Sequence, residues 1–572
     1  MKVYRTEFPN PQFERENWLC LNGEWEFEID NAKVGKEKGY QNRPSLDGKI
    51  NVPFAPESEL SGVGNTDFMF VVWYRKEVTL PESMKGKRVF LHFGAVDHEA
   101  TVFVNGKQVG YHMGGFVPFS VEVTEFGDNF TVVVCAEDDT TTAIGHGKQC
   151  PSLNSYGCYY TRTTGIWQSV WLEAVGERYI ENFRVTPMID SKEAVIEVEA
   201  KDCYGAEIVA EAFYEGKKQG ETRFKMTDGC TISAIKLDEL HLWELGKGRL
   251  YDLTIKMIYN GKVTDEVKSY FGMRSVMFDG MKFLLNGKSV FGRFVLDQGF
   301  YQDGIFTAPD TDRFIQDIKI SMDMGFNGAR LHQKIFEPLA LYYCDKMGYM
   351  VWDEYPSWGL DRHSFECVNQ YLYEWMECVK RDYNHPSIIG WCVLNEVWDR
   401  DRKRINDEAI KIGYWATKWY DKSRPVIDTS GGFHIVTDTF DVHDYEGNLE
   451  KFAEKYEKGQ FVTFDNVQKY EGQPYWLSEY GGIKYIPFGD REQGSWGYGD
   501  AAKTEEEFLQ RYCGITASIM KNPDTWGFCY TQIYDVEQEV NGLYSYDRKC
   551  KFSEEGVKRI RECNSAKAAI ED

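Results

Sequence analysis

The sequence predicts two β-sandwich domains followed by a closed (β/α)₈ TIM barrel, and three observations support that fold class. At 572 residues the chain is too long for one hydrophobic core. Up to about residue 272 it consists of short runs of alternating apolar and polar residues separated by turn residues. From residue 273 onward, apolar runs alternate with amphipathic helical stretches, a pattern typical of repeated βα units around a parallel sheet.

Residues 1–175 are expected to form an N-terminal β jelly-roll domain. Runs such as WYRKEVTL, RVFLHFGAV and FTVVVCAED have the two-residue period of half-buried strands, and VNGKQVG carries an Asn-Gly hairpin turn. No long helical period interrupts them, which favours a jelly-roll sandwich. Residues 176–272 contain further runs of this kind, AVIEVEAKD, AEIVAEAFY and RLYDLTIKMIY, over roughly the ~100 residues that an immunoglobulin-like β-sandwich requires.

Residues 273–572 contain enough candidate strands for a closed barrel. Helical stretches such as DTDRFIQDIKISMDM and TEEEFLQRYCGITASIM lie between most of the apolar runs, and about 300 residues is close to the usual size of this fold. The candidate strands are SVFGRFVLD, FNGARL, YMVWDE, IIGWCVLNE, PVIDTS, FDVHDY, YWLSEY and TWGFCYTQ.

Composition excludes several classes of partner. Lys and Arg number 66 against 90 Asp and Glu, and the net charge of −24 argues against nucleic acid or an anionic membrane as partner. The start of the chain lacks the apolar region of a signal peptide, and the 14 cysteines include no C-x-x-C pair, so we expect reduced thiols and a cytoplasmic location. Without zinc-type spacing or a phosphate-binding glycine loop, we expect no metal and no cofactor.

Two glutamates follow apolar strands of the predicted barrel. Glu396 ends the run IIGWCVLNE, and Glu479 follows PYWLS, which places them at the ends of the fourth and seventh strands. Catalytic groups of such barrels lie at the carboxyl ends of the strands. Two carboxyl groups facing one pocket are what glycoside hydrolysis requires, one as acid and one as nucleophile or base.

At these residues the chain resembles glycoside hydrolase family 2, which includes β-galactosidases, β-glucuronidases and β-mannosidases. The resemblance covers essentially the whole chain. ERENWLCLNGEWEFEID and TRTTGIWQSVWLE resemble the start and the last strand of the family's sugar-binding domain, and FGMRSVMFDGMKFLLNGKSVFGR resembles the passage into the barrel. HPSIIGWCVLNE, WLSEYGG and NGLYSYDRKCKF are similar to its acid/base strand, its nucleophile strand and the end of its barrel.

The resemblance implies a retaining double displacement, with Glu396 as acid/base and Glu479 as nucleophile. It also implies that Asn395 hydrogen-bonds the sugar 2-hydroxyl, that Tyr445 hydrogen-bonds the nucleophile, and that Arg330 pairs with it. For each of these three a purely structural role is the alternative. We expect the cation beside Glu479 to keep it ionised while burial raises the pKa of Glu396.

Five further residues are candidates for contact with the sugar. The family's histidine follows its arginine by three places, whereas His332 comes one place early, so a structural role is equally consistent with it. His443 precedes the candidate tyrosine by two residues. Trp358 and Tyr530 stand near strand ends and are expected to form a stacking platform, and Tyr159 lies where the first domain reaches toward the barrel mouth.

The identity of the substrate sugar is inferred by elimination. Family β-glucuronidases carry Asn-x-Lys where this chain has Glu539 and Asn541, and a glutamate there would repel a uronate. Trp358 and Leu360 occupy the places of the family's Glu-x-His magnesium pair, so that metal site is expected to be absent. A neutral β-galactoside is therefore the first choice.

Two alternatives remain open. One is a β-glucuronidase or β-galacturonidase that binds the carboxylate with other basic residues, such as Arg362 or Lys484. The other is a catalytically inactive carbohydrate-binding protein. The expected partner is a small carbohydrate, and a homo-oligomer is expected because the β domains offer edges for such contacts.

Overall fold

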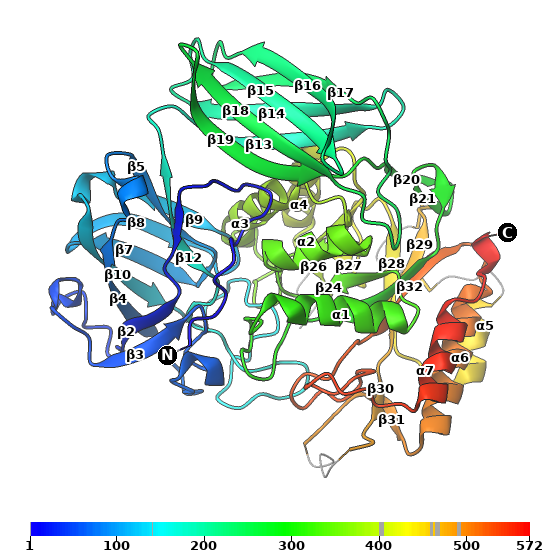
Figure 1. Ribbon diagram of the computed structural model, residues 1–572. Helices are drawn as coiled ribbons and strands as arrows, with labels where there is room; N and C mark the ends of the chain where they lie inside the picture. The colour runs from blue at the N-terminus through cyan, green and yellow to red at the C-terminus, as the bar shows by residue number, and fades with distance from the viewer. Residues whose placement is uncertain are drawn as a thin grey trace.

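The structure is a computed structural model that describes residues 2–139, 141–399, 405–457, 462–463, 470–488 and 494–571. It contains the predicted two β-sandwiches and a barrel of parallel strands, so the predicted fold class is confirmed (Figure 1). In the described residues, none of the helices has both the length and the apolar character needed to span a membrane.

The N-terminal sandwich consists of two antiparallel sheets, ordered β3-β2-β4-β10-β7-β8 and β1-β12-β5-β9. Along β10 the residues alternate, so that Val132 and Val134 enter the main core while Val133 and Cys135 pack in a smaller cluster with Trp73. The strands are β1 (Trp18–Cys20), β2 (Gly23–Ile29), β3 (Gly48–Val52), β4 (Val71–Thr79), β5 (Arg88–Phe93), β6 (Val96–Asp97), β7 (Glu99–Val104), β8 (Lys107–Met113), β9 (Phe119–Glu122), β10 (Asn129–Glu137), β11 (Gly165–Ile166) and β12 (Val170–Val175).

The second sandwich has its own apolar core between sheets ordered β13-β14-β17 and β16-β15-β18-β19. A small sheet, β20-β21-β22, then leads into the barrel, and its Phe278 and Phe283 pack on Trp526. The strands are β13 (Tyr179–Met188), β14 (Glu193–Lys201), β15 (Glu207–Tyr214), β16 (Lys217–Lys225), β17 (Cys230–Lys236), β18 (Tyr251–Tyr259), β19 (Lys262–Phe271), β20 (Val276–Asp279), β21 (Lys282–Leu285) and β22 (Lys288–Ser289).

The barrel is a nearly closed parallel sheet with the order β27-β26-β25-β24-β23-β32-β29-β28. Each strand coincides with one of the predicted runs, because strands covered on both faces are nearly continuous apolar segments. The strands are β23 (Gly292–Asp297), β24 (Gly328–Leu331), β25 (Met350–Glu354), β26 (Ile388–Asn395), β27 (Val426–Ser430), β28 (Phe440–Asp444), β29 (Tyr475–Gly481) and β32 (Thr525–Thr531). A short pair, β30 (Ile483–Tyr485) and β31 (Tyr498–Ala502), follows β29.

Helices surround the barrel. Asp310 caps α1 by accepting a hydrogen bond from the backbone NH of Arg313, and Thr504 caps α6 in the same way. Residues 431–439, all described, connect β27 to β28 without a helix. The helices are α1 (Thr311–Asp323), α2 (Pro338–Met347), α3 (Cys367–Asp382), α4 (Asp407–Tyr420), α5 (Leu449–Tyr456), α6 (Glu505–Met520) and α7 (Glu554–Asn564).

Aromatic rings fill the interior of the barrel. Trp352, Trp476 and Trp526 pack against one another with ring centroids 4.9–6.1 Å apart, and each is fully buried. Gly390 makes room for this cluster, since a Cβ there would lie 2.3 Å from the Trp352 ring. The interior is thus packed as a core, and an open pocket is possible only above it, at the carboxyl ends of the strands.

Candidate active site

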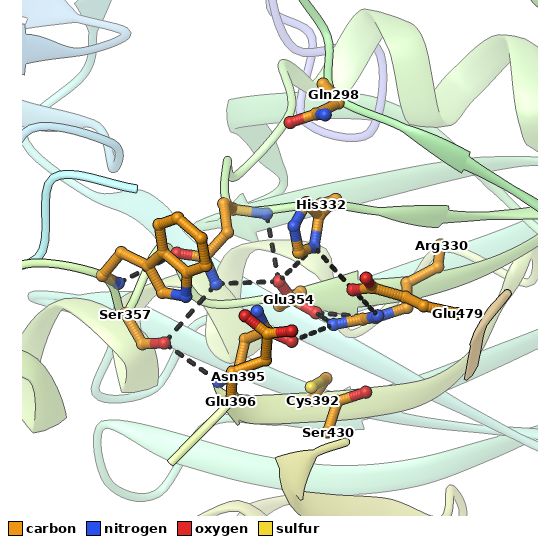
Figure 2. A network of polar contacts seen from close by, with 12 residues as sticks. Gln298, Arg330, His332, Glu354, Ser357, Cys392, Asn395, Glu396, Ser430 and Glu479 are labelled. Atoms are coloured by element: carbon orange, nitrogen blue, oxygen red, sulfur yellow. Dashed lines mark hydrogen bonds and ion pairs between the residues drawn. The ribbon is translucent and has the colours of Figure 1, made fainter. Parts of the chain in front are cut away.

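The two candidate catalytic glutamates lie close together at the carboxyl ends of β26 and β29 (Figure 2). A carboxylate oxygen of Glu396, one of Glu479 and a ring nitrogen of His443 all lie within 4.8 Å of one another. Retaining glycosidases hold their two carboxyl groups about 5–5.5 Å apart, whereas inverting enzymes need about 6.5–9.5 Å. The observed separation therefore suits direct attack on the sugar by one carboxylate.

Arg330 of β24 holds the nucleophile candidate from within the barrel. Its Nη1 donates to Glu479 Oε1 at 2.8 Å, and its Nη2 donates to Asn395 Oδ1 at 2.7 Å. On the other side, Nε donates to Glu354 Oε2 at 2.8 Å. All of these side chains are buried, so the guanidinium is fixed between two carboxylates (Figure 2).

Asn395 presents one unused donor. Its Oδ1 accepts from Arg330, and its backbone NH donates to Ser357 Oγ at 3.0 Å. Its buried Nδ2 has no hydrogen-bond partner among the described residues. A buried amide donor without a partner is costly, and a sugar hydroxyl would satisfy it. This geometry suits the 2-hydroxyl contact that the family resemblance implies.

Tyr445 follows β28 and donates a hydrogen bond from its hydroxyl to Glu479 Oε2. The same hydroxyl lies 3.1 Å from Thr531 Oγ1, and its ring stacks face to face on Tyr498. Glu479 is thus held at one oxygen by Arg330 and at the other by Tyr445. Both contacts favour the ionised carboxylate that a nucleophile requires.

His443 of β28 touches both candidate catalytic residues. Its Nδ1 lies 2.9 Å from Glu396 Oε1, and its Nε2 lies 3.3 Å from Glu479 Oε1. The ring is packed against the backbone of Gly431, where a Cβ would lie 2.3 Å from the imidazole. The sequence predicted His443 as a sugar contact, and in the structure the ring contacts both glutamates.

The charge states differ from the expectation in one respect. Burial alone would raise the pKa of Glu396, but the hydrogen bond and the charge of His443 lower that pKa to about 2. Burial would likewise raise the pKa of Glu479, but His443, His332 and Arg330 lower it. The expectation that burial raises the pKa of Glu396 is therefore wrong for the unliganded pocket. The imidazole of His443 beside that carboxyl reverses the effect of burial.

His332 follows β24, and its Nδ1 lies 3.0 Å from Glu354 Oε1 and 3.9 Å from Glu479 Oε1. Burial lowers the pKa of His332 despite the carboxylates beside it. The ring is therefore neutral near pH 7, and it faces the catalytic residues as a hydrogen-bonding group rather than as a cation.

A loop of the N-terminal domain reaches the candidate active site. This loop, residues 141–164 between β10 and β11, runs to the barrel (cyan in Figure 1). There the backbone NH of His146 donates to the Trp358 carbonyl at 2.7 Å, and the Tyr159 and Trp358 rings are 5.2 Å apart. Trp358 and Tyr159, both predicted from sequence, thus form one aromatic edge.

Lys148 of the same loop is a pocket residue that the sequence analysis did not identify. Its Nζ lies 3.8 Å from the centroid of the Trp358 ring, and the residue is 6% exposed. Burial alone would lower the pKa of Lys148, but the acidic groups around it, Cys158, Glu539 and both catalytic glutamates, raise it. Among the described residues the ammonium of Lys148 makes no hydrogen bond or ion pair. Lys148 is thus a buried cation that contacts an aromatic ring but has no anionic partner at ion-pair distance among the described residues.

Glu539, which the sequence suggested would repel a uronate, is occupied by other side chains. Its Oε2 accepts a hydrogen bond from the Tyr160 hydroxyl, and its Oε1 accepts one from Asn541 Nδ2 at 2.9 Å. Burial raises the pKa of Glu539, although Lys148 and these donors oppose the shift. Both oxygens of Glu539 are thus engaged by buried donors, which weakens the argument against an anionic sugar.

The prediction that Tyr530 belongs to a stacking platform for the sugar is wrong. Tyr530 is fully buried, and its ring packs on Tyr480 and on Tyr512 of α6, with centroids 5.6 and 4.8 Å away. Successive residues of a strand point to opposite faces, and Tyr530 faces the helix layer rather than the pocket. It therefore cannot stack on a sugar above the strands.

Glu354 is a further site residue that was not predicted from the sequence, although its position at the end of a barrel strand could have indicated it. It ends β25, where a carboxylate at the carboxyl end of a barrel strand is a marker of the site. In addition to the hydrogen bond from Arg330, Glu354 accepts hydrogen bonds from the backbone NH and the side chain of Gln333, at 3.1 and 2.9 Å. For Lys148 there was no such signal, because only the docking of the 141–164 loop buries it.

Comparisons with known proteins support the three-part architecture. Family models described as Glycosyl hydrolases family 2 match along the chain, with the sugar binding domain at residues 19–173, the central model at 178–274 and the TIM barrel domain at 277–493. The solved structure of Ruminococcus gnavus β-glucuronidase covers 98% of this chain and 100% of its own, with a TM-score of 0.80 at 21% identity. At that identity the likeness supports the fold.

Curated relatives carry more than one activity name. A β-galactosidase of Thermoanaerobacter pseudethanolicus is 29% identical over 410 residues, which are 67% of this chain and 52% of the relative. A putative β-glucuronidase of Formosa agariphila is 25% identical over 449 residues, or 72% and 51% of the two chains. This chain therefore spans about half the length of these two relatives.

Proposed function

The chain belongs to glycoside hydrolase family 2, and we propose that it is an exo-acting retaining β-glycosidase. The observation that carries this proposal is the Glu396–Glu479 pair, with carboxylate oxygens within 4.8 Å. Glu479 attacks the anomeric carbon and forms a covalent glycosyl-enzyme while the departing oxygen receives a proton through Glu396. Glu396 then removes a proton from water, which releases the sugar with its configuration retained.

The polar contacts around the pair support this division of roles. Arg330 and Tyr445 each hold one oxygen of Glu479, which fixes its direction of attack. The Glu396 side chain is 27% exposed, against 5% for Glu479, so Glu396 is the more accessible of the two, which suits the residue that protonates a departing oxygen and then activates water.

Covalent trapping tests the mechanism. A 2-deoxy-2-fluoro glycoside with a dinitrophenyl leaving group should form an ester on Glu479, visible as a mass increase of the intact protein and of the peptide that contains it. Glu479→Ala should abolish the adduct. Glu396→Ala should retain far more activity on dinitrophenyl glycosides than on phenyl glycosides, because a good leaving group needs no acid. Absence of any adduct or turnover would favour an inactive carbohydrate-binding protein.

For the sugar, we propose a β-glucuronide or β-galacturonide in preference to the neutral β-galactoside chosen by elimination. Lys148 supports the anionic sugar, because its buried ammonium has no hydrogen-bond or ion-pair partner among the described residues, and a substrate carboxylate would supply one. Arg362 and Lys484, which the sequence offered as alternative binders of the sugar carboxylate, have other contacts. Arg362 donates to the Glu396 carbonyl at 3.0 Å, and Lys484 donates to the Ser495 carbonyl at 2.9 Å.

A panel of nitrophenyl β-glycosides separates the two sugars. Lys148→Met should lower kcat/KM on the uronide by roughly 30-fold or more, the range for losing one partner of a buried charge pair, and should affect the galactoside much less. Lys484→Met is the matched control and should leave the uronide rate nearly unchanged. Faster turnover of the galactoside by the unaltered protein would overturn the uronide proposal without touching the retaining mechanism.

A cytoplasmic location and a homo-oligomeric state are also proposed. Sedimentation velocity at micromolar concentration tests the second, and a species of single-chain mass, 66.3 kDa, would contradict it.

A further inference from the structure

His443 is placed to do more than contact a sugar. It bridges the two catalytic carboxylates through its two ring nitrogens, with Nδ1 at 2.9 Å from Glu396 and Nε2 at 3.3 Å from Glu479. An imidazolium donates from both nitrogens, so the protonated ring matches both acceptors at once.

From this geometry we propose that His443 holds the catalytic proton in the unliganded enzyme and exchanges it with Glu396 in step with the charge on Glu479. The proposal rests on the retaining mechanism above. It assigns His443 a role in proton transfer between the two glutamates, in addition to any contact with substrate.

The groups that face His443 from the neighbouring strands support a protonated ring. Glu396 and Glu479 contact it from β26 and β29, and on its own strand β28 the charge of His443 lowers the pKa of Asp441. Arg330 Nη1, 3.4 Å from Nε2, opposes them. Burial alone would lower the pKa of His443, but the two glutamates outweigh burial and Arg330 and raise it.

Nucleophilic attack changes this balance. When Glu479 bonds to the anomeric carbon, its negative charge is lost, and with it a main reason for the ring to remain protonated. The proton moves from His443 Nδ1 to Glu396 and from Glu396 to the glycosidic oxygen as that bond breaks. The imidazole ends neutral, Glu396 stays an anion, Glu479 is an ester and the aglycone leaves as an alcohol.

The second half-reaction reverses the transfer. Water attacks the anomeric carbon, Glu396 accepts its proton, and the ester bond to Glu479 breaks. The carboxylate of Glu479 re-forms and again favours a protonated His443, which takes the proton from Glu396. Charge and protons balance over the cycle, and each transfer follows the charge of the nucleophile.

His443→Asn tests the proposal, because asparagine keeps a polar side chain but cannot hold the proton. With 2,4-dinitrophenyl, 4-nitrophenyl and phenyl glycosides of one sugar, kcat/KM should fall roughly 10²-fold or more for the phenyl leaving group, and much less for dinitrophenyl. The alkaline limb of the pH–rate profile should also move down by about two pH units, the difference between the ordinary pKa values of an imidazole and a glutamic acid, since the proton is then held by a carboxyl group.

His332→Asn is the matched control, because His332 is a pocket imidazole without a contact to Glu396. It should lower the rates without leaving-group dependence. Equal losses for all leaving groups and an unmoved alkaline limb in His443→Asn would overturn the proposal. If the asparagine variant does not fold, His443→Gln takes its place. Covalent trapping of the unaltered protein keeps this outcome separate from failure of the retaining mechanism.

Discussion

Tyr160 of the N-terminal domain donates its hydroxyl hydrogen to Glu539, in the segment that follows the last barrel strand. Gln298 Nε2 donates to the same hydroxyl at 2.7 Å, and Asn541 donates to the other oxygen of Glu539. All four side chains are buried. The N-terminal domain therefore supplies part of the pocket wall.

Loss of this hydroxyl should destabilise the protein. Tyr160→Phe leaves Glu539 and Gln298 with unmet hydrogen bonds in a buried site, which costs about 1–3 kcal/mol in the free energy of unfolding. Urea unfolding followed by tryptophan fluorescence measures the change. Tyr156→Phe, in the same loop but 49% exposed, should have no effect. Equal stability of the two variants would show that the contact contributes nothing.

Gly147 fixes the position of Lys148. Its φ is +62°, and a Cβ there would lie 2.1 Å from the Gln333 carbonyl oxygen, so Gly147→Ala must push the loop away from the barrel. We expect KM for the preferred glycoside to rise about tenfold while the barrel stays folded. Gly216→Ala is the control, because its φ is +76° but a Cβ there meets open space. An unchanged KM in Gly147→Ala would show that the loop does not position a binding group.

Arg330→Lys should impair catalysis, although the charge is kept. The guanidinium serves Glu479, Asn395 and Glu354 from three nitrogens, and a single ammonium cannot reach all of them. We expect kcat/KM to fall by roughly 10²-fold or more, with most of the loss in kcat, because the nucleophile is then poorly oriented. A loss confined to KM would instead assign Arg330 to ground-state sugar binding.

Sequence patterns were sufficient for the fold class. The barrel strands are continuous apolar runs, and in the sandwich strands apolar and polar residues alternate. The local sequence pattern was therefore enough to predict the architecture. For the same reason Glu396 and Glu479 could be placed at strand ends. The resemblance to a family then pointed to Arg330 and Tyr445, and the structure places both against Glu479.

The features of the site that the sequence did not predict depend on contacts between segments far apart in the chain. Lys148 looks like any loop lysine until its loop docks beside Trp358. Tyr530 lies in an apolar run with aromatic residues on both faces, so the sequence did not fix which face it takes. The lowered pKa of Glu396 arises from His443, which is 47 residues further along the chain. Charge states depend on such neighbours and not on burial alone.

Stability in acid should depend on a buried ion pair below the pocket. Asp421 accepts hydrogen bonds from Arg424 at 2.6 Å and from the Trp391 indole at 2.8 Å. Burial alone would raise the pKa of Asp421, but Arg424 and these hydrogen bonds lower it to about 2. Because the pKa is lower in the folded state, Asp421 stabilises the protein above its unfolded pKa of about 3.9, and this contribution is lost as the pH falls toward 2.

Asp421→Asn should therefore reduce the free energy of unfolding at pH 7 by on the order of 2 kcal/mol and flatten its dependence on pH between about 4 and 2. Urea unfolding at a series of pH values measures both effects. Asp190→Asn, an exposed carboxylate in the turn after β13, should change neither. If the asparagine variant of Asp421 kept the full acid dependence of the unaltered protein, the ion pair with Arg424 would not be a source of it, because only a titrating carboxyl can produce that slope.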